Sequence, residues 1–117
     1  MTSMHLSTLE ATLLAAIESA IKAGYTICDC GDYWINTSGN MRQCSAIGAL
    51  VLSTMQGVVG GKSVANTDAV RACLVTHGLS TLNAVAIDDG YDGRMYGSND
   101  AFNYLGARLR PLPSTLT

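Results

Sequence analysis

Apolar residues recur at helical spacing in the first part of this chain, and they form one face of a predicted helix over about 8–23. Ser7 and Glu10 have the spacing of a capping box at the start of this helix. Gly24 has the position of a residue that ends it, because glycine readily adopts the left-handed conformation found after many helices. The pattern therefore predicts an amphipathic first helix with both ends marked.

The pattern changes between Tyr25 and Asn36, where aromatic and β-branched residues replace the helical repeat. Residues of these types favour strands, and the polar segment 29–32 contains a glycine that suits a turn. The segment therefore predicts a short β-ribbon made of two strands joined by that turn.

Asn40 and Gln43 predict the start of a second helix that runs to about Gln56. Apolar residues lie around most of its circumference, which is typical of a buried helix at the centre of a domain. The small residues Cys44, Gly48 and Ala49 would let a neighbouring helix approach it closely. This helix is therefore the expected centre of the fold.

Each of the last three predicted helices follows a polar cap residue and precedes glycine or proline. They run from Asn66 or Thr67 to His77, from Ser80 to Asp89 with Gly90 as the stop, and from Ser98 to Arg110. The expected architecture is an all-α bundle of about five helices, with a minor β-ribbon between the first and second.

The length of 117 residues fits one domain, and we expect a single helical domain with an ordered core over about 6–111. Charged residues make up 14% of the chain, compared with about 25% in typical globular domains, so uncharged polar residues must cover much of the surface. The net charge of −2 provides no basic surface for a phosphate backbone. Direct binding of nucleic acid is therefore not expected.

The longest apolar run, Ala46–Leu52, is far shorter than the roughly 20 residues that span a bilayer. The N-terminus has no basic region before an apolar stretch, which argues against a secretory signal. We therefore expect a cytoplasmic protein without membrane contact, in which the four cysteines are reduced thiols.

Two motifs resemble those of small, mostly uncharacterised bacterial and phage proteins. The first is the run Cys44-Ser45-Ala46-Ile47-Gly48-Ala49-Leu50, and the second is Gly90-Tyr91-Asp92-Gly93, followed in the last helix by Leu105-Gly106. In those proteins a Cys-Ala-(Leu/Ile)-Gly-Ala-Leu helix precedes a Gly-(Phe/Tyr)-Asp-Gly turn. The resemblance implies a helical fold and a phage or mobile-element accessory protein, such as an inhibitor of a host protein.

Metal binding or cysteine catalysis is an alternative function, and its candidate residues are Cys28, Cys30, Cys73 and His77. Cys73 and His77 are four positions apart and would share one helix face, while Cys28 and Cys30 would share one face of a strand. Zinc sites usually contain two ligand pairs with two to four residues within each pair, and that spacing is not repeated here. We therefore expect no metal and no cofactor.

A non-enzymatic protein-binding module is the favoured function, because no catalytic set of residues is convincing. Tyrosine, tryptophan and arginine are common anchors of protein interfaces. The candidate binding residues lie in the expected ribbon and in a loop from Asp89 to Ser98, and they are Tyr33, Trp34, Tyr91, Asp92, Arg94 and Tyr96. The opposite interpretation, in which the aromatic residues belong to the core or its boundary, is equally open.

Overall fold

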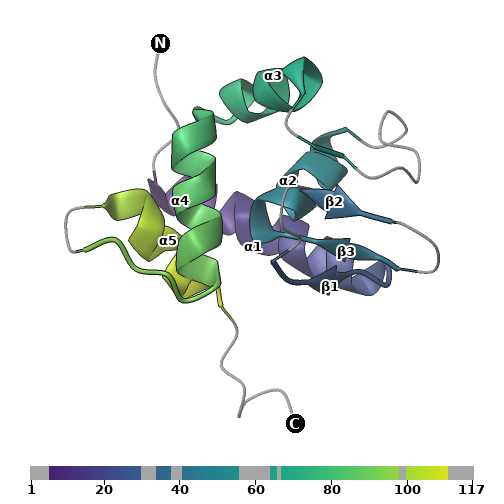
Figure 1. The fold of residues 1–117 in the computed structure, drawn as a ribbon, viewed down its shortest axis with the longest axis horizontal. Coiled ribbons are helices and arrows are strands. Elements are labelled where there is room, and N and C mark those ends of the chain that lie inside the picture. Colours follow the sequence, from purple (N-terminus) through teal and green to yellow (C-terminus); the bar gives the residue numbers. More distant parts are fainter. Residues whose placement is uncertain are drawn as a thin grey trace, which may run out of the picture.

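The computed structural model describes residues 6–29, 34–37, 41–55, 64–65, 67–97 and 100–110. Within these ranges the chain is mainly α-helical and includes one small three-stranded sheet (Figure 1). The helices are α1 (Leu6–Lys22), α2 (Ala46–Thr54), α3 (Asp68–Thr76), α4 (Thr81–Tyr91) and α5 (Ala101–Leu109). The expected mainly helical architecture is therefore confirmed.

The strands are β1 (Thr26–Ile27), β2 (Ile35–Asn36) and β3 (Gln43–Cys44), and β3 lies in the middle of the sheet. It runs parallel to β1 and antiparallel to β2. The predicted ribbon is therefore wrong in its pairing, because its two strands both bond a third strand that was expected inside the second helix. Ile35 and Cys44 face each other across β2 and β3 and are fully buried, so burial of both side chains favours this arrangement.

The predicted helix starts are correct for two helices and wrong for three. Thr67 and Ser80 cap α3 and α4, where each hydroxyl accepts a backbone N–H of the first turn. Ser7 lies inside α1, so the predicted capping box is wrong. Ser45 caps α2 and Asp100 caps α5, in both cases later in the chain than expected. Several polar residues precede each of these two helices, and local spacing did not identify the residue that caps the helix.

Three helices end in the same way, with a glycine at positive φ. Gly24, Gly78 and Gly93 follow α1, α3 and α4 with φ values of 93°, 73° and 91°. The residue after each glycine donates its N–H to a carbonyl five residues earlier, as in a Schellman motif. The expected ends of α1 and α3 are confirmed, whereas α4 continues through Gly90 to Tyr91.

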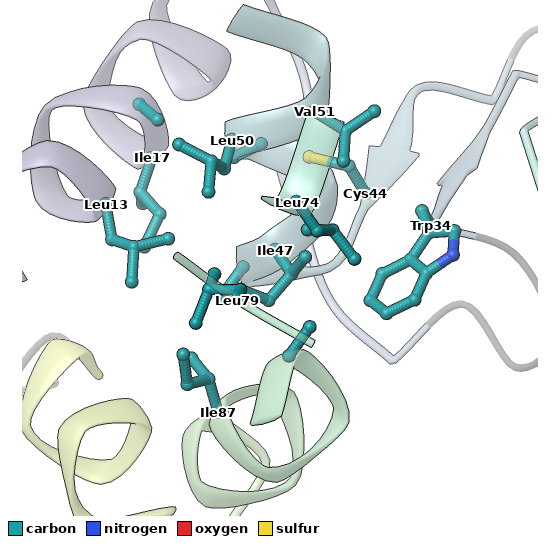
Figure 2. Packing of buried hydrophobic residues seen from close by; sticks show 14 of the residues in the cluster. Leu13, Ile17, Trp34, Cys44, Ile47, Leu50, Val51, Leu74, Leu79 and Ile87 are labelled. Carbon is teal, nitrogen blue, oxygen red and sulfur yellow. The ribbon is translucent and has the colours of Figure 1, made fainter. Parts of the chain in front are cut away.

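The helix α2 is the centre of the hydrophobic core, as predicted. Every residue from Ala46 to Val51 is buried, on all sides of the helix. Leu13 of α1, Leu74 of α3 and Ile87 of α4 surround it (Figure 2). Burial on this scale is the main source of stability for a domain with few charges.

The first turn of α2 touches the backbone that precedes β2. A Cβ atom on Gly48 would lie 1.9 Å from the carbonyl oxygen of Trp34. The same carbonyl accepts the N–H of Ser45 at 3.0 Å, so the two segments are held in contact. The close neighbour of Gly48 is therefore a segment beside the sheet, so the expectation of a neighbouring helix is wrong at this residue. A helix does pack against α2 elsewhere, because α1 lies beside it near Ala49.

The backbones of α4 and α5 are also in direct contact. A Cβ atom on Gly90 would lie 1.9 Å from the carbonyl oxygen of Asn103, and one on Gly106 would lie 1.9 Å from that of Ile87. These reciprocal contacts show that the two helices run in opposite directions, and that neither glycine leaves room for a side chain.

In the described part of the chain, no helix is by itself long and apolar enough to cross a membrane. Taken together, α3 and α4 have the length and the apolar composition of a membrane span, but the chain bends by 81° between the two helices. Val70, Leu74 and Ile87 of this pair are buried in the core, which accounts for the apolar character of the two segments.

Replacing Gly48 by alanine is expected to destabilise the fold by about 3 kcal/mol, because the added methyl group cannot fit beside the Trp34 carbonyl unless the backbone moves. Ser53→Ala is the matched control, since Ser53 is exposed on the same helix. Urea denaturation gives the free energy of unfolding of both variants. A Gly48→Ala protein within about 0.5 kcal/mol of wild type contradicts this packing of α2.

Candidate functional site

The loop that joins α4 to α5 folds back onto both helices. Directly after α4, Gly93 has positive φ, and the N–H of Arg94 bonds the carbonyl oxygen of Asp89 at 2.7 Å. The chain therefore reverses direction at once and runs along the α4–α5 pair towards the start of α5 (Figure 1). Loops that are positioned by rigid elements often provide the functional residues of a protein.

The side chain of Asn103, on α5, holds this loop in place through hydrogen bonds. Its side chain is completely buried. Its Nδ2 donates to the carbonyl oxygens of Ala86 and Arg94, both at 2.9 Å, and its Oδ1 accepts the N–H of Tyr96 at 2.6 Å. One amide side chain therefore binds α4 and both ends of the segment Arg94–Tyr96, which fixes the backbone of that segment.

The Arg94 side chain binds carboxylates from two parts of the chain. It forms ion pairs with Asp29, which follows β1, and with Asp89 of α4 at 3.1 Å. The Asp92 carboxylate lies 3.8 Å from the same guanidinium, and the Tyr96 hydroxyl donates to Asp89. These contacts join the end of β1 to the end of α4, although more than 60 residues separate Asp29 from Arg94.

Three consecutive side chains of this loop are exposed. The Arg94 side chain is 57% exposed, Met95 is 44% exposed and Tyr96 is 54% exposed. Arginine, methionine and tyrosine are enriched in protein interfaces. We call the exposed residues Arg94, Met95 and Tyr96 the 94–96 surface. It combines exposed side chains with a backbone held by Asn103.

The structure distributes the other predicted binding residues differently. Tyr91 belongs to the last turn of α4 and is buried in the core, so its placement in an exposed loop was wrong. Trp34 is also buried, which fits the alternative that aromatic residues cover the core. Asp92 is the C-cap of α4, and its side chain is largely covered. Tyr33 and Ser98 lie outside the described residues.

Asp88 connects α4 to the first turn of α2. Its Oδ1 accepts the N–H of Ile47 at 2.8 Å, which satisfies a donor that the helix itself leaves unpaired. Burial raises the pKa of Asp88 to about 7, although the N–H of Ile47 and a hydrogen bond from Ser45 oppose this effect. Cys44 faces the same carboxylate, and burial raises the pKa of its thiol to about 12. The sequence analysis missed Asp88, because its partner is 41 residues away.

Among the described candidates, Cys73 and His77 do not form a direct thiol–imidazole pair. Thr54 lies between them: its hydroxyl interacts with the Cys73 thiol and lies 3.0 Å from His77 Nε2. When the Thr54 hydroxyl donates to the carbonyl oxygen of Leu50 at 2.8 Å, His77 Nε2 is the donor to Thr54. Burial raises the pKa of the Cys73 thiol, which disfavours the nucleophilic thiolate.

Metal ligands do not gather in the part of the chain that the structure describes, where no three His, Cys, Asp or Glu side chains could hold one ion. Cys44 and Cys73 are buried thiols, and the backbone N–H of Cys28 bonds the carbonyl oxygen of Cys44 at 2.9 Å. Cys30 lies outside the described residues. The described geometry thus favours packing roles for Cys44 and Cys73.

A shallow hollow of about 470 Å³ lies between α1 and α2, beside His77. Its walls are small or uncharged side chains, namely Thr8, Ala11, Thr12, Ala15, Ala16, Leu50, Ser53 and Thr54. Burial lowers the pKa of His77, so this residue is neutral near pH 7. Among the described residues that line this hollow, none is an acidic or a lysine or arginine side chain.

Comparison of the chain with protein-family models, with curated proteins and with solved structures finds no match.

Asn103→Ala is expected to destabilise the protein by about 2–4 kcal/mol, because it removes the hydrogen-bond partner of one buried and two partly buried backbone groups. It should also speed amide hydrogen exchange at Tyr96 and Gly97. Asn83→Ala, the same change on α4, is the control. Exchange at Tyr96 that is as slow as in wild type contradicts the role of Asn103 in fixing the loop.

The pH dependence of stability provides a test of Asp88. The folded protein holds the Asp88 proton more tightly than the unfolded chain, in which this group titrates near 3.8. Its contribution to stability is therefore complete below about pH 4 and is lost as the pH rises to about 7. The Asp88→Asn side chain keeps an acceptor for Ile47 but does not titrate.

We therefore expect wild type to lose up to about 4 kcal/mol of stability relative to Asp88→Asn between pH 4 and pH 8. Urea denaturation of both proteins at each pH measures this difference, in which the titration of His77 and other groups cancels. A difference that stays constant with pH contradicts the buried position assigned to the carboxylate.

Proposed function

We propose that this protein is a small non-enzymatic binding module that contacts a protein partner through the 94–96 surface. The proposal depends on one observation: Arg94, Met95 and Tyr96 are exposed, while buried Asn103 holds their backbone in place.

Preorganisation is the physical advantage of this arrangement. Binding normally costs free energy because loops and side chains must be ordered at the interface. Here the hydrogen bonds of Asn103 and the contact between Tyr96 and Asp89 order the loop before a partner arrives. The apolar surface of Met95 and the ring of Tyr96 then remain available to enter a pocket on the partner.

The arrangement of the cysteines and His77 supports this function over the alternative. A cysteine-dependent enzyme needs an accessible thiolate beside a base, whereas Cys73 is buried and its pKa is raised. Within the described residues, the acidic side chains nearest the 94–96 surface form ion pairs with Arg94 and stay partly exposed, which supports a contact surface.

The proposed biological setting comes from the sequence motifs. The resemblance to small bacterial and phage proteins supports an accessory protein of a phage or mobile element, one that acts in the cytoplasm as an inhibitor of a host protein. The small size of the chain and its low charge suit a module that acts by occupying a surface of its partner.

The experiment is an affinity capture from bacterial lysate, followed by calorimetry with the purified partner. The double variant Met95→Ala/Tyr96→Ala should bind at least about 30-fold more weakly, because the loss of even one interface anchor costs about 2 kcal/mol or more. Val75→Ala/Leu82→Ala is the matched control, since it removes two exposed apolar side chains from α3 and α4. Thermal melting establishes that each variant is folded.

Equal affinity of wild type and the Met95→Ala/Tyr96→Ala variant would place the partner elsewhere and refute the 94–96 surface. A loss of affinity in the Val75→Ala/Leu82→Ala control alone would assign binding to the exposed apolar residues of α3 and α4.

A further inference from the structure

The charged groups around the 94–96 surface are predominantly acidic. Asp29, Asp89 and Asp92 lie within ion-pair distance of Arg94. These three are one third of the nine acidic residues in the chain. Among the described residues, the nearby basic groups are Arg94 and Arg110, of which Arg110 donates to the carbonyl oxygen of Tyr91 at 2.7 Å.

The net charge of this group follows from the structure. Three aspartates and two arginines give a net charge of −1. A charge of this size is concentrated at one end of a protein whose total charge is −2. The 94–96 surface therefore has a negative rim.

Arg94 does not reverse this sign. Its guanidinium already binds the carboxylates of Asp29 and Asp89, so an acidic partner would have to displace those ion pairs and approach the displaced carboxylates. The side chain of Asp29 is 45% exposed while it binds Arg94. The local chemistry thus disfavours phosphate or carboxylate ligands and favours cationic donors.

We propose that the partner of the 94–96 surface presents a basic segment, in which lysine or arginine residues flank an apolar side chain. This inference rests on the proposed function, because it assigns a chemical class to the partner of the same surface. The apolar side chain packs against Met95 and Tyr96, and the cationic groups lie over the rim that contains Asp29 and Asp92. Electrostatic complementarity of this kind speeds association and selects between partners.

A second copy of this chain is a poorer occupant. Two copies that met through the same surface would bring two negative rims together, and Arg94 of each copy is already paired with its own Asp29. Like charges across an interface oppose association. Concentration-dependent dimerisation through Met95 and Tyr96 would therefore overturn the proposal.

Selection from a random dodecapeptide display library tests the proposal even before the natural partner is identified. Wild type and the Met95→Ala/Tyr96→Ala variant are used in parallel, and synthetic versions of the peptides enriched on wild type are titrated by calorimetry. We expect enriched peptides with a net charge of +2 or more and at least one large apolar residue. Their affinity should fall at least about fivefold between 50 and 300 mM NaCl, since salt screens exposed charges.

A charge variant tests the acidic rim directly. Asp29→Asn/Asp92→Asn should weaken binding of the enriched peptides about fivefold and reduce the effect of salt. Asp68→Asn is the matched control, because Asp68 is almost fully exposed on α3 and also pairs with an arginine. This control should bind like wild type.

The outcomes separate the two levels of the proposal. Neutral or acidic peptides that still require Met95 and Tyr96 would overturn the basic partner and keep the binding surface. Peptides that bind the Met95→Ala/Tyr96→Ala variant as tightly as wild type would overturn the surface itself. An equal loss of affinity in Asp68→Asn and Asp29→Asn/Asp92→Asn would show that total charge, and not the local rim, controls binding.

Discussion

The contact between the backbones of α4 and α5 is the constraint on which the candidate site depends. Gly90 and Gly106 lie against carbonyl groups of the opposite helix, and no side chain fits at either position. This close approach brings Asn103 of α5 within hydrogen-bond distance of α4 and of the loop that follows it. A larger separation of the helices would break these bonds, so the conformation of the 94–96 surface depends on two residues without side chains.

The last two turns of α4 combine a structural role with a role at the surface. Asp88 faces inward and binds the first turn of α2, the most buried helix of the protein. Its neighbour Asp89 faces outward and binds Arg94 and Tyr96. Consecutive residues of a helix point in different directions, so one short segment connects the core to the proposed binding surface. Asp88 is therefore only one residue away from Asp89, which binds the side chains of the loop.

The burial of each aromatic residue decides whether it stabilises the core or is accessible to a partner. Trp34 and Tyr91 are buried, where their large apolar surfaces stabilise the fold. Tyr96 comes only five residues after Tyr91, yet it is more than half exposed, because Gly93 reverses the chain between them. The backbone turn thus decides which tyrosine can meet a partner.

The sequence alone determined the helices, because helical periodicity and cap residues are local signals. It identified the amphipathic α1, the central α2, the caps Thr67 and Ser80, and the loop that contains Arg94 and Tyr96. Only the tertiary structure decided the sheet, because strands of two residues have no recognisable period and β3 pairs with residues far from it in the chain. The sequence did contain one signal for Asp88 and Asn103, because each is a polar residue on an otherwise apolar helix face. Their roles became visible only once distant backbone groups were brought into hydrogen-bond range.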